Sequence, residues 1–128
     1  MPEKPLAQKL LIKSGYRVLI TNAPEGYRPR LGSLPPDAVV DDRVGSPADL
    51  IQFFVTSRRD LESGLPGLKK VLKPNGLLWV TYPKGTSGAG ADINRDSIAA
   101  HASTIGLQAV AMVSIDDTWS AMRLKMVG

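Results

Sequence analysis

The 128-residue sequence contains no cysteine and only one histidine, His101. Without cysteine the chain can form no disulfide, and it offers neither a thiolate nucleophile nor a thiolate metal ligand. No serine or carboxylate stands at a telling spacing from His101, so a catalytic triad has no support and we expect a partly exposed structural residue there. We therefore predict no catalytic residues, no metal site and no cofactor.

Long apolar runs and aromatic residues are also scarce. No apolar run approaches the roughly 20 residues of a membrane-spanning helix, and the amino terminus lacks the apolar segment of a signal peptide. We therefore expect a cytoplasmic protein that does not enter a membrane. Aromatic residues make up only 5% of the sequence, which disfavours an extended base-stacking surface for nucleic acid.

The net charge of +4 is concentrated in residues 1–30, which hold two glutamates and six basic residues. The basic residues are Lys4, Lys9, Lys13, Arg17, Arg28 and Arg30. Scattered charges of this kind usually form a solvated surface, yet a basic segment can also attract phosphate-rich partners. A nucleic-acid-associated regulator is therefore kept as an alternative function and not as the first expectation.

The segment that is best defined by its pattern is LKKVLKPNGLLWVTYP, residues 68–83. It predicts the end of a helix, a turn at Pro74-Asn75-Gly76 and a buried strand. Its nearly unbroken apolar run is typical of a central parallel strand that is covered on both faces. A chain of this length fits one domain, and no linker is long enough to divide it, so residues 1–128 are predicted to form a single domain.

Helical and strand patterns alternate along the rest of the chain. We expect a helix from Leu6 that ends before Gly15, followed by strands at residues 16–21, 38–41 and 49–56. A second helix is expected to be capped by Ser57 and divided by Gly64 and Pro66. A third helix is expected from about residues 92–95 to Ile105, followed by two strands at residues 108–115 and 118–126. Alternation of this kind predicts an α/β domain with a mostly parallel sheet. The last two strands read as an antiparallel hairpin.

This order of elements resembles a contracted class I S-adenosylmethionine-dependent methyltransferase. LAQKLLIKSGYRVLI resembles the helix and first strand that deliver the cofactor loop, DLIQFFV resembles the fourth strand, and LKKVLKPNGLLWV resembles the turn before the fifth. The resemblance implies a single three-layer Rossmann-like domain with a mostly parallel sheet and a C-terminal antiparallel hairpin.

The chain also resembles a bacterial family of small domains of unknown function. The segments NAPEGY, LKPNGLLWVTYPK, DINRD and DDTWSAMR occur in this order and extend over nearly all of the sequence. This second resemblance is more specific than the first, and it implies no established reaction.

Two departures from the methyltransferase pattern bear on function. An active enzyme has a GxGxG loop after the first strand, whereas this chain has Thr21 to Gly26, TNAPEG, in which Ala23 and Pro24 fill space that the cofactor would need. In addition, only about eight residues connect Asp41 to Asp49, where a full-size enzyme has a helix, a strand and another helix. So short a link conflicts with the usual length of a parallel crossover, which leaves the second strand's placement open.

Ligands of open α/β sheets bind beyond the carboxyl ends of the strands. This rule selects the loops at residues 22–27, 57–59 and 83–90. We expect their polar residues and one glycine to converge on one crevice: Asn22, Glu25, Gly26, Tyr27, Arg58, Arg59 and Lys84. The cations suit a carboxylate or phosphate and Glu25 suits a hydroxyl or amine. The alternative interpretation is that NAPEGY is only a turn and that the cations are surface charges.

The DINRD cluster is expected at a helix start, with Asp92 as its N-cap or Asp96 in its first turn. Arg95 is expected to pair with Asp116 or Asp117 of the hairpin turn. Both aspartates are interpreted as turn residues and not as metal ligands.

These observations favour a noncatalytic methyltransferase-like domain that binds a small anionic ligand or a protein partner, with a homodimer through the terminal hairpin as a further expectation. The alternative is a minimal S-adenosylmethionine-dependent methyltransferase whose site is rebuilt from Asn22, Glu25, Asp41 and residues 83–90. Methyl transfer needs no protein nucleophile, so the scarcity of catalytic side chains does not exclude it.

Overall fold

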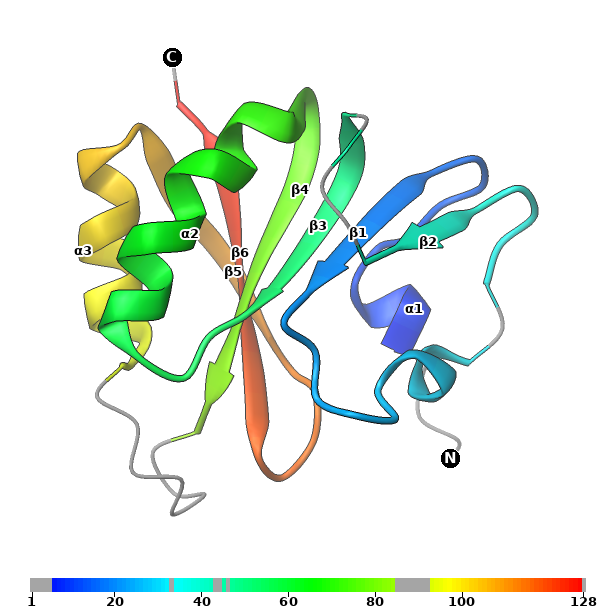
Figure 1. Cartoon of the computed structure of the whole chain (residues 1–128), viewed down its shortest axis with the longest axis horizontal. Coiled ribbons are helices and arrows are strands. Elements are labelled where there is room, and N and C mark those ends of the chain that lie inside the picture. Colours follow the sequence, from blue (N-terminus) through cyan, green and yellow to red (C-terminus); the bar gives the residue numbers. More distant parts are fainter. Residues whose placement is uncertain (1–5, 33, 43–44, 46, 85–92, 128) are drawn as a thin grey trace.

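The computed structural model describes residues 6–32, 34–42, 45, 47–84 and 93–127. Its helices and strands are α1 (Leu6–Lys9), β1 (Arg17–Thr21), the 3₁₀ helix η1 (Arg28–Leu31), β2 (Val39–Asp41), β3 (Ala48–Phe54), α2 (Arg58–Val71), β4 (Leu72–Pro83), α3 (Arg95–Thr104), β5 (Leu107–Ser114) and β6 (Trp119–Met126). The strands form a six-stranded sheet in the order β2-β1-β3-β4-β6-β5 (Figure 1). None of the helices in this described part of the chain is long and apolar enough to cross a bilayer.

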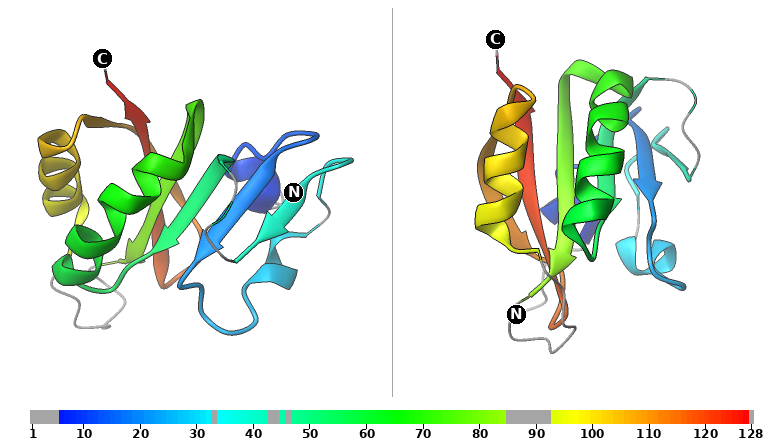
Figure 2. Two further views of the ribbon diagram at one scale, coloured as in Figure 1. Left: turned by 45° about the horizontal axis from the view of Figure 1, so that its top comes forward. Right: turned by 60° about the vertical axis from the view of Figure 1, so that its left-hand side comes forward.

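The sheet lies between two layers of helix. Alternate residues of β3 point to opposite faces, so Ile51 joins one apolar cluster with Leu65 of α2, whereas Leu50 joins the other with Leu10. The helices α2 and α3 lie side by side on the first face (Figures 1 and 2), and α1 and η1 cover the second. The first four strands are parallel and β6 and β5 are antiparallel, which confirms the predicted three-layer fold with its terminal hairpin.

Strand β4 is the central strand that its apolar run predicts. It pairs with β3 in parallel and with β6 in antiparallel orientation. Leu78 and Val80 pack on the α2 side, and Trp79 is buried on the other side. The Trp79 Nε1–H donates to the carbonyl oxygen of Leu10 at 2.9 Å, so the indole is fully satisfied inside the core.

The predicted division of the helix at Gly64 and Pro66 is wrong, because α2 is continuous from Arg58 to Val71. A Cβ at Gly64 would lie 2.5 Å from Cζ of Phe53, so glycine here lets the helix approach β3. Pro66 removes one helical hydrogen bond, but the apolar face of α2 packs on the sheet over its whole length and maintains the helix. The predicted cap is confirmed, with the Asp60 N–H donating to Ser57 Oγ at 3.0 Å.

The predicted turn at Pro74-Asn75-Gly76 is instead an irregularity within β4. Ala48 pairs with Leu72 and Leu50 pairs with Leu77, so five positions on β4 match two on β3 and three residues are extra. The helix therefore ends at Val71, earlier than predicted. A Cβ at Gly76 would lie 2.5 Å from Leu72 Cδ1, which explains why glycine stands where the chain bulges back on itself.

The structure also defines the length of the first helix and the place of the second strand. The first helix spans only Leu6–Lys9, because Leu11 adopts the left-handed conformation at φ 66° and turns the chain. Strand β2 is present, and it pairs with β1 on the side opposite to β3. The strands β2 and β3 are therefore not neighbours, and the short link after Asp41 suffices because β2 is only three residues long.

Candidate ligand-binding site

A cavity of about 400 Å³ lies at the carboxyl ends of β1 and β2. It is formed by the end of β1, the loop after it, the start of η1 and the residue after β2. The lining residues are Ile20, Asn22, Ala23, Pro24, Gly26, Tyr27, Arg28, Pro29 and Asp42. This is the end of the sheet at which open α/β folds bind their ligands.

Two left-handed residues shape the loop after β1. Asn22 has φ 60° and Gly26 has φ 80°, conformations that asparagine and glycine tolerate better than other residues. The Tyr27 N–H donates to the carbonyl oxygen of Pro24 at 3.2 Å and closes the turn between them. The chain thereby folds back against the sheet and enters η1 directly.

Tyr27 anchors this loop in the core. Its ring is 2% exposed and lies edge-on to Phe54 at a centroid distance of 4.7 Å. Its hydroxyl donates to Gln52 Oε1 at 2.9 Å, and Gln52 Nε2 donates to Thr81 Oγ1 at 3.1 Å. Burial raises the pKa of Tyr27 to about 12, against the smaller opposing effect of the Gln52 hydrogen bond. The ring therefore lines the cavity while the hydroxyl is protonated and holds the loop to β3.

The helix η1 is also tied to the terminal hairpin. Arg30 Nη2 lies 2.8 Å from Asp116 Oδ2, and the backbone N–H groups of Thr118 and Trp119 donate to Asp116 Oδ1 at 2.8 Å each. The predicted pairing of Arg95 with Asp116 or Asp117 is therefore wrong. Arg95 Nε instead lies 3.9 Å from Asp96 Oδ1, and Arg30 of η1 is the guanidinium that pairs with Asp116.

One cation and one anion, Arg28 and Asp42, are among the residues that line the cavity. Arg28 is exposed, and its Nη2 donates to the carbonyl oxygen of Val40 at 2.8 Å, which holds η1 to β2. Asp42 is exposed at the end of β2. The neighbouring Asp41 is engaged elsewhere, since its Oδ2 lies 2.6 Å from Arg17 Nη1.

The sequence reasoning missed both charged residues of this cavity. Asp42 follows directly after the second predicted strand. The rule that ligands bind beyond the carboxyl ends of strands points to it once that strand is placed. Arg28 carries no comparable signal, because its position depends on the turn that Tyr27 makes into the core.

The structure brings together only part of the predicted site. Asn22, Gly26 and Tyr27 line the cavity, and Glu25 is an exposed residue of the same loop. Lys84 Nζ donates to Ser114 Oγ at 2.7 Å. The predicted ligand-binding roles of these residues stay predictions, and residues 85–90 of the third predicted loop lie outside the described residues.

Arg58 and Arg59 belong to another part of the molecule. Both are exposed in the first turn of α2, and Arg58 lines a separate hollow of about 250 Å³ between α2 and α3. His101 borders the same hollow, half-buried as predicted, and its Nε2 has no hydrogen-bond partner in the described part of the chain. Among residues 6–32, 34–42, 45, 47–84 and 93–127, no three His, Asp or Glu side chains gather closely enough to hold a metal ion.

The N-cap of α3 is Asn94. Its Oδ1 accepts the Ser97 N–H at 2.9 Å, and Ser97 Oγ accepts the Asn94 N–H at 3.0 Å, which makes a reciprocal capping box. Asp96 lies in the first turn as predicted. Asp92, the other candidate for the cap, lies outside the described residues.

A family described as "Protein of unknown function (DUF3052)" matches residues 32–127, which is most of the chain. The chain belongs to this DUF3052 family. The matched region begins after η1 and includes all strands from β2 to β6. A search of curated proteins finds no match to this DUF3052 chain.

Several solved structures that resemble this DUF3052 protein are described as methyltransferases. A SAM-dependent methyltransferase from Aquifex aeolicus matches with a TM-score of 0.66 and 15% identity, covering 95% of this chain and 88% of the other. A TehB-like SAM-dependent methyltransferase from Corynebacterium glutamicum matches at 0.60 and 13%, covering 94% and 85%. A ribosomal protein L11 methylase from Lactobacillus delbrueckii subsp. bulgaricus matches at 0.59 and 11%, covering 96% and 75%. At these identities the likeness shows a methyltransferase-like fold and nothing about chemistry.

Proposed function

We propose that this DUF3052 protein is a noncatalytic methyltransferase-like domain that binds a small anionic ligand at the carboxyl ends of β1 and β2. The observation that carries the proposal is the cavity of about 400 Å³ that Arg28 and Asp42 both border. Its size falls within the range of small-molecule sites, roughly 300 to 1,000 Å³. Its place in the fold is the ligand-binding end of an open α/β sheet.

The charges that border the cavity indicate the chemistry of the ligand. The planar guanidinium of Arg28 suits a carboxylate or a phosphate, which it can bind with paired N–H groups. The carboxylate of Asp42 accepts hydrogen bonds and suits a hydroxyl or an amine. A ligand that carries both groups, such as a sugar phosphate or a nucleotide, satisfies both residues at once.

The loop after β1 supports a noncatalytic role. Ala23 and Pro24 line the cavity with side chains, where the fold's enzymes present bare glycine backbone to the cofactor. The buried hydrogen bond from Tyr27 to Gln52 holds the loop in this position. Moving the loop away from the sheet would leave Gln52, which is 0% exposed, with an unsatisfied oxygen.

One observation favours the alternative of a minimal S-adenosylmethionine-dependent methyltransferase. Asp42 follows directly after the second strand and borders the cavity, and a carboxylate in that place can accept hydrogen bonds from the hydroxyl groups of a nucleoside. This version uses Asp42 in place of Asp41, whose carboxylate is paired with Arg17. The two proposals differ in the ligand that they predict.

The basic amino-terminal segment gives no comparable support to a nucleic-acid-associated regulator. Arg17 pairs with Asp41 and Arg30 pairs with Asp116, and Arg28 donates to a backbone carbonyl of β2. Arg17 and Arg28 thereby hold the amino-terminal segment to β2, and Arg30 holds it to the terminal hairpin. Two of the three guanidinium groups face carboxylates that reduce their attraction for phosphate.

The test is a thermal-shift panel with ADP, ribose 5-phosphate, S-adenosylmethionine and S-adenosylhomocysteine. A ligand that binds only the folded state stabilises it by about 2.7 kcal/mol at a hundredfold excess over Kd. We expect a rise in Tm with a phosphate-bearing ligand and its loss in Arg28→Gln and in Asp42→Asn. Glu62→Gln, a charge-neutralising change on the exposed side of α2, is the matched control and should retain the shift.

The outcomes separate the two functions. Stabilisation by S-adenosylmethionine that Asp42→Asn abolishes would favour the methyltransferase alternative. The proposal fails if none of the four compounds raises Tm, or if the shift survives in both cavity variants.

A further inference from the structure

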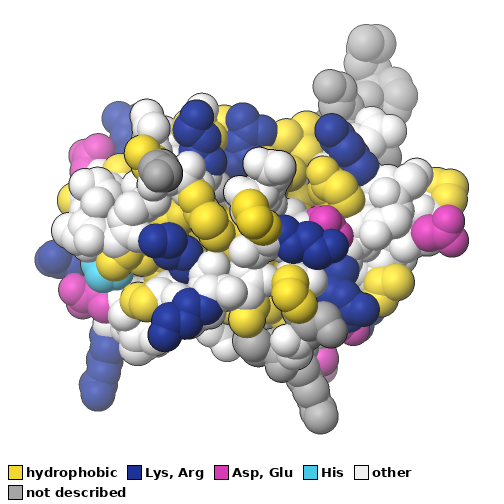
Figure 3. All heavy atoms as spheres, turned by 90° about the horizontal axis from the view of Figure 1, so that it is seen from above, with side chains coloured by type: hydrophobic (Ala, Val, Ile, Leu, Met, Phe, Trp, Pro, Cys, Tyr) yellow, Lys and Arg dark blue, Asp and Glu magenta, His cyan; other side chains and the backbone are white. Residues whose placement is uncertain are grey.

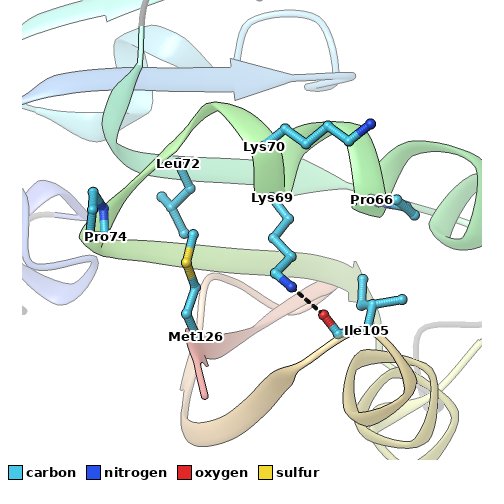
Figure 4. A pocket seen from close by; sticks show the side chains of 7 residues that line it. All are labelled: Pro66, Lys69, Lys70, Leu72, Pro74, Ile105 and Met126. Atoms are coloured by element: carbon cyan, nitrogen blue, oxygen red, sulfur yellow. Dashed lines mark hydrogen bonds between the residues drawn. The ribbon is translucent and has the colours of Figure 1, made fainter. Parts of the chain in front are cut away.

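Two adjoining hollows lie at the opposite end of the sheet, where the parallel strands begin. The first, of about 480 Å³, is bordered by the end of α2 and the start of β4 (Figure 4). The second, of about 320 Å³, lies across β4 from it and is bordered by β5 and β6. Pro74 and Met126 line both hollows and form the ridge between them. We call the two hollows together the cationic groove.

The groove exists because of the three extra residues in β4. Leu72 pairs with β3 before the irregularity and Leu77 pairs with it afterwards, so Pro74 and its neighbours bulge out of the sheet. Gly76 allows this bulge to pass close over Leu72. The floor of the first hollow is apolar and is formed by Leu72, Ile105 and Met126.

The flanks of the groove are basic. Lys69 and Lys70 line the first hollow, and Arg123 and Lys125 line the second. No aspartate or glutamate lines either hollow in the described part of the chain. The nearby Lys73 is different, because its Nζ lies 3.1 Å from Asp49 Oδ1. Figure 3, which looks onto this end, shows Lys and Arg side chains interspersed with exposed hydrophobic ones.

Two of these cations are held in place. Lys69 Nζ donates to the carbonyl oxygen of Ile105 at 2.5 Å, so its ammonium is fixed at the edge of the first hollow (Figure 4). The guanidinium of Arg123 lies 5.9 Å from the centroid of the Trp79 ring. Its Nε is buried and has no hydrogen-bond partner among the described residues.

We propose that the cationic groove docks an acidic amphipathic segment of a partner protein. Two apolar side chains of the segment occupy the two hollows, and flanking carboxylates lie against Lys70 and against Arg123 and Lys125. Charge complementarity selects the acidic partner. The first hollow has an apolar floor, and the second combines Leu77, Val110 and Met126 with polar residues, so the pair selects a segment with two apolar anchors and flanking charges. The apolar surface is concave, whereas a lipid bilayer requires apolar side chains that protrude. Because the ligand cavity lies at the other end of the strands, both sites can be occupied together.

The test uses a fluorescein-labelled twelve-residue probe peptide in which glutamates flank two leucines, measured by fluorescence anisotropy. The double variant Lys70→Glu/Lys125→Glu should weaken binding about tenfold, since each reversal replaces an attraction by a repulsion. Both side chains are exposed, so the change leaves the core intact. Arg95→Glu is the matched control, an exposed reversal in the first turn of α3, and should bind as the unmodified protein does.

Methyl NMR of the methionines locates the contact. Met126 lines both hollows, whereas Met122 is 4% exposed within the core and Met112 lies on the edge strand β5. We expect the probe to shift the Met126 methyl signal and to leave the Met112 and Met122 signals in place. This readout is independent of the ligand cavity, so it can succeed or fail regardless of the proposed ligand-binding function.

Three outcomes would overturn the proposal. In the first, a probe whose leucines are replaced by serine binds equally well, which would reduce the interaction to charge alone. In the second, a probe with glutamine in place of glutamate binds equally well. In the third, the protein binds phosphatidylglycerol vesicles through Lys70 and Lys125 and does not bind the peptide.

Discussion

At the scale of single residues, Tyr27 and Gln52 decide the shape of the candidate site. The Tyr27 hydroxyl donates to Gln52, which lies on the same face of β3 as Leu50 and Phe54, and Gln52 in turn donates to Thr81. This chain of hydrogen bonds joins the loop after β1 to both β3 and β4. Tyr27, which the sequence marks as a candidate ligand contact, therefore also holds the loop against the core.

Replacing Tyr27 by phenylalanine tests this role. The ring and its contact with Phe54 remain, but the buried Gln52 oxygen loses its donor, so we expect a loss of about 1 to 3 kcal/mol in the free energy of unfolding. Urea denaturation measures the change. Tyr16→Phe, a similar change at a partly exposed tyrosine, is the control, and an equal effect in both variants would contradict the anchoring role.

At the scale of elements, the loops and caps at the carboxyl ends of the strands differ in how strongly the local sequence defines them. The segment at residues 22–31 makes no α-helix and closes with a single 3₁₀ turn, η1. By contrast, α3 begins at a reciprocal capping box of Asn94 and Ser97 that satisfies two amide groups locally. Local hydrogen bonds of this kind fix a helix start, whereas η1 depends on Tyr27 and Leu31, which are buried against distant strands.

The cap gives a prediction at this scale. Asn94→Ala removes the acceptor for the Ser97 N–H, and we expect a loss of about 1 kcal/mol in the free energy of unfolding. Thermal or urea denaturation monitored by circular dichroism measures it. Asn94→Asp retains an acceptor and should keep the stability of the unmodified protein; if both variants lose the same amount, the cap does not act as described.

At the scale of the whole molecule, two aspartates tie distant segments together. Asp116 joins the hairpin turn to Arg30 of η1, and Asp49 of β3 accepts the Arg17 N–H at 2.8 Å and lies beside Lys73. Desolvation raises the pKa of each carboxyl, but the hydrogen bonds from backbone N–H groups and the neighbouring cations outweigh it, so both pKa values are lowered. The Asp116 contact connects the first and last thirds of the chain, and the Asp49 contacts connect the first third to the middle third.

Lowered pKa values predict an acid-labile fold. A carboxyl whose folded-state pKa lies below its unfolded value of about 3.9 contributes its full stability above that pH and loses it as the pH falls through the folded-state pKa. We expect Asp116→Asn to lower the free energy of unfolding at pH 7 by about 1 to 2 kcal/mol. The difference from the unmodified protein should shrink below about pH 4. Urea titrations across this range measure it.

Asp117→Asn is the control for this effect, because Asp117 is the exposed neighbour in the same turn. The free energy of unfolding of the Asp117→Asn variant should equal that of the unmodified protein across the titration. A difference between Asp116→Asn and the unmodified protein that persists unchanged at pH 3 would show that the carboxylate's charge is not responsible.

The sequence alone determined the order of the elements and the layers that they form. Hydrophobic periodicity placed β1, β3, β4 and the hairpin, because a strand buried on both faces and a helix buried on one leave patterns that can be read without knowing their partners. Predictions from single helix-breaking residues were wrong where tertiary packing overrides local preference. Gly64 and Pro66 look like helix breakers, yet α2 continues because its apolar face rests on the sheet.

The tertiary structure alone decided which charged residues share a cavity. Arg28 and Asp42 line the same cavity because the Tyr27 hydroxyl bonds to Gln52 of β3 and because β2 lies beside β1. The cationic groove likewise combines α2, β4 and β6, which are distant in sequence. Hydrophobic periodicity shows how each segment is buried. Contacts between segments depend on strand register and on how side chains from distant segments pack together, and no single segment determines that packing.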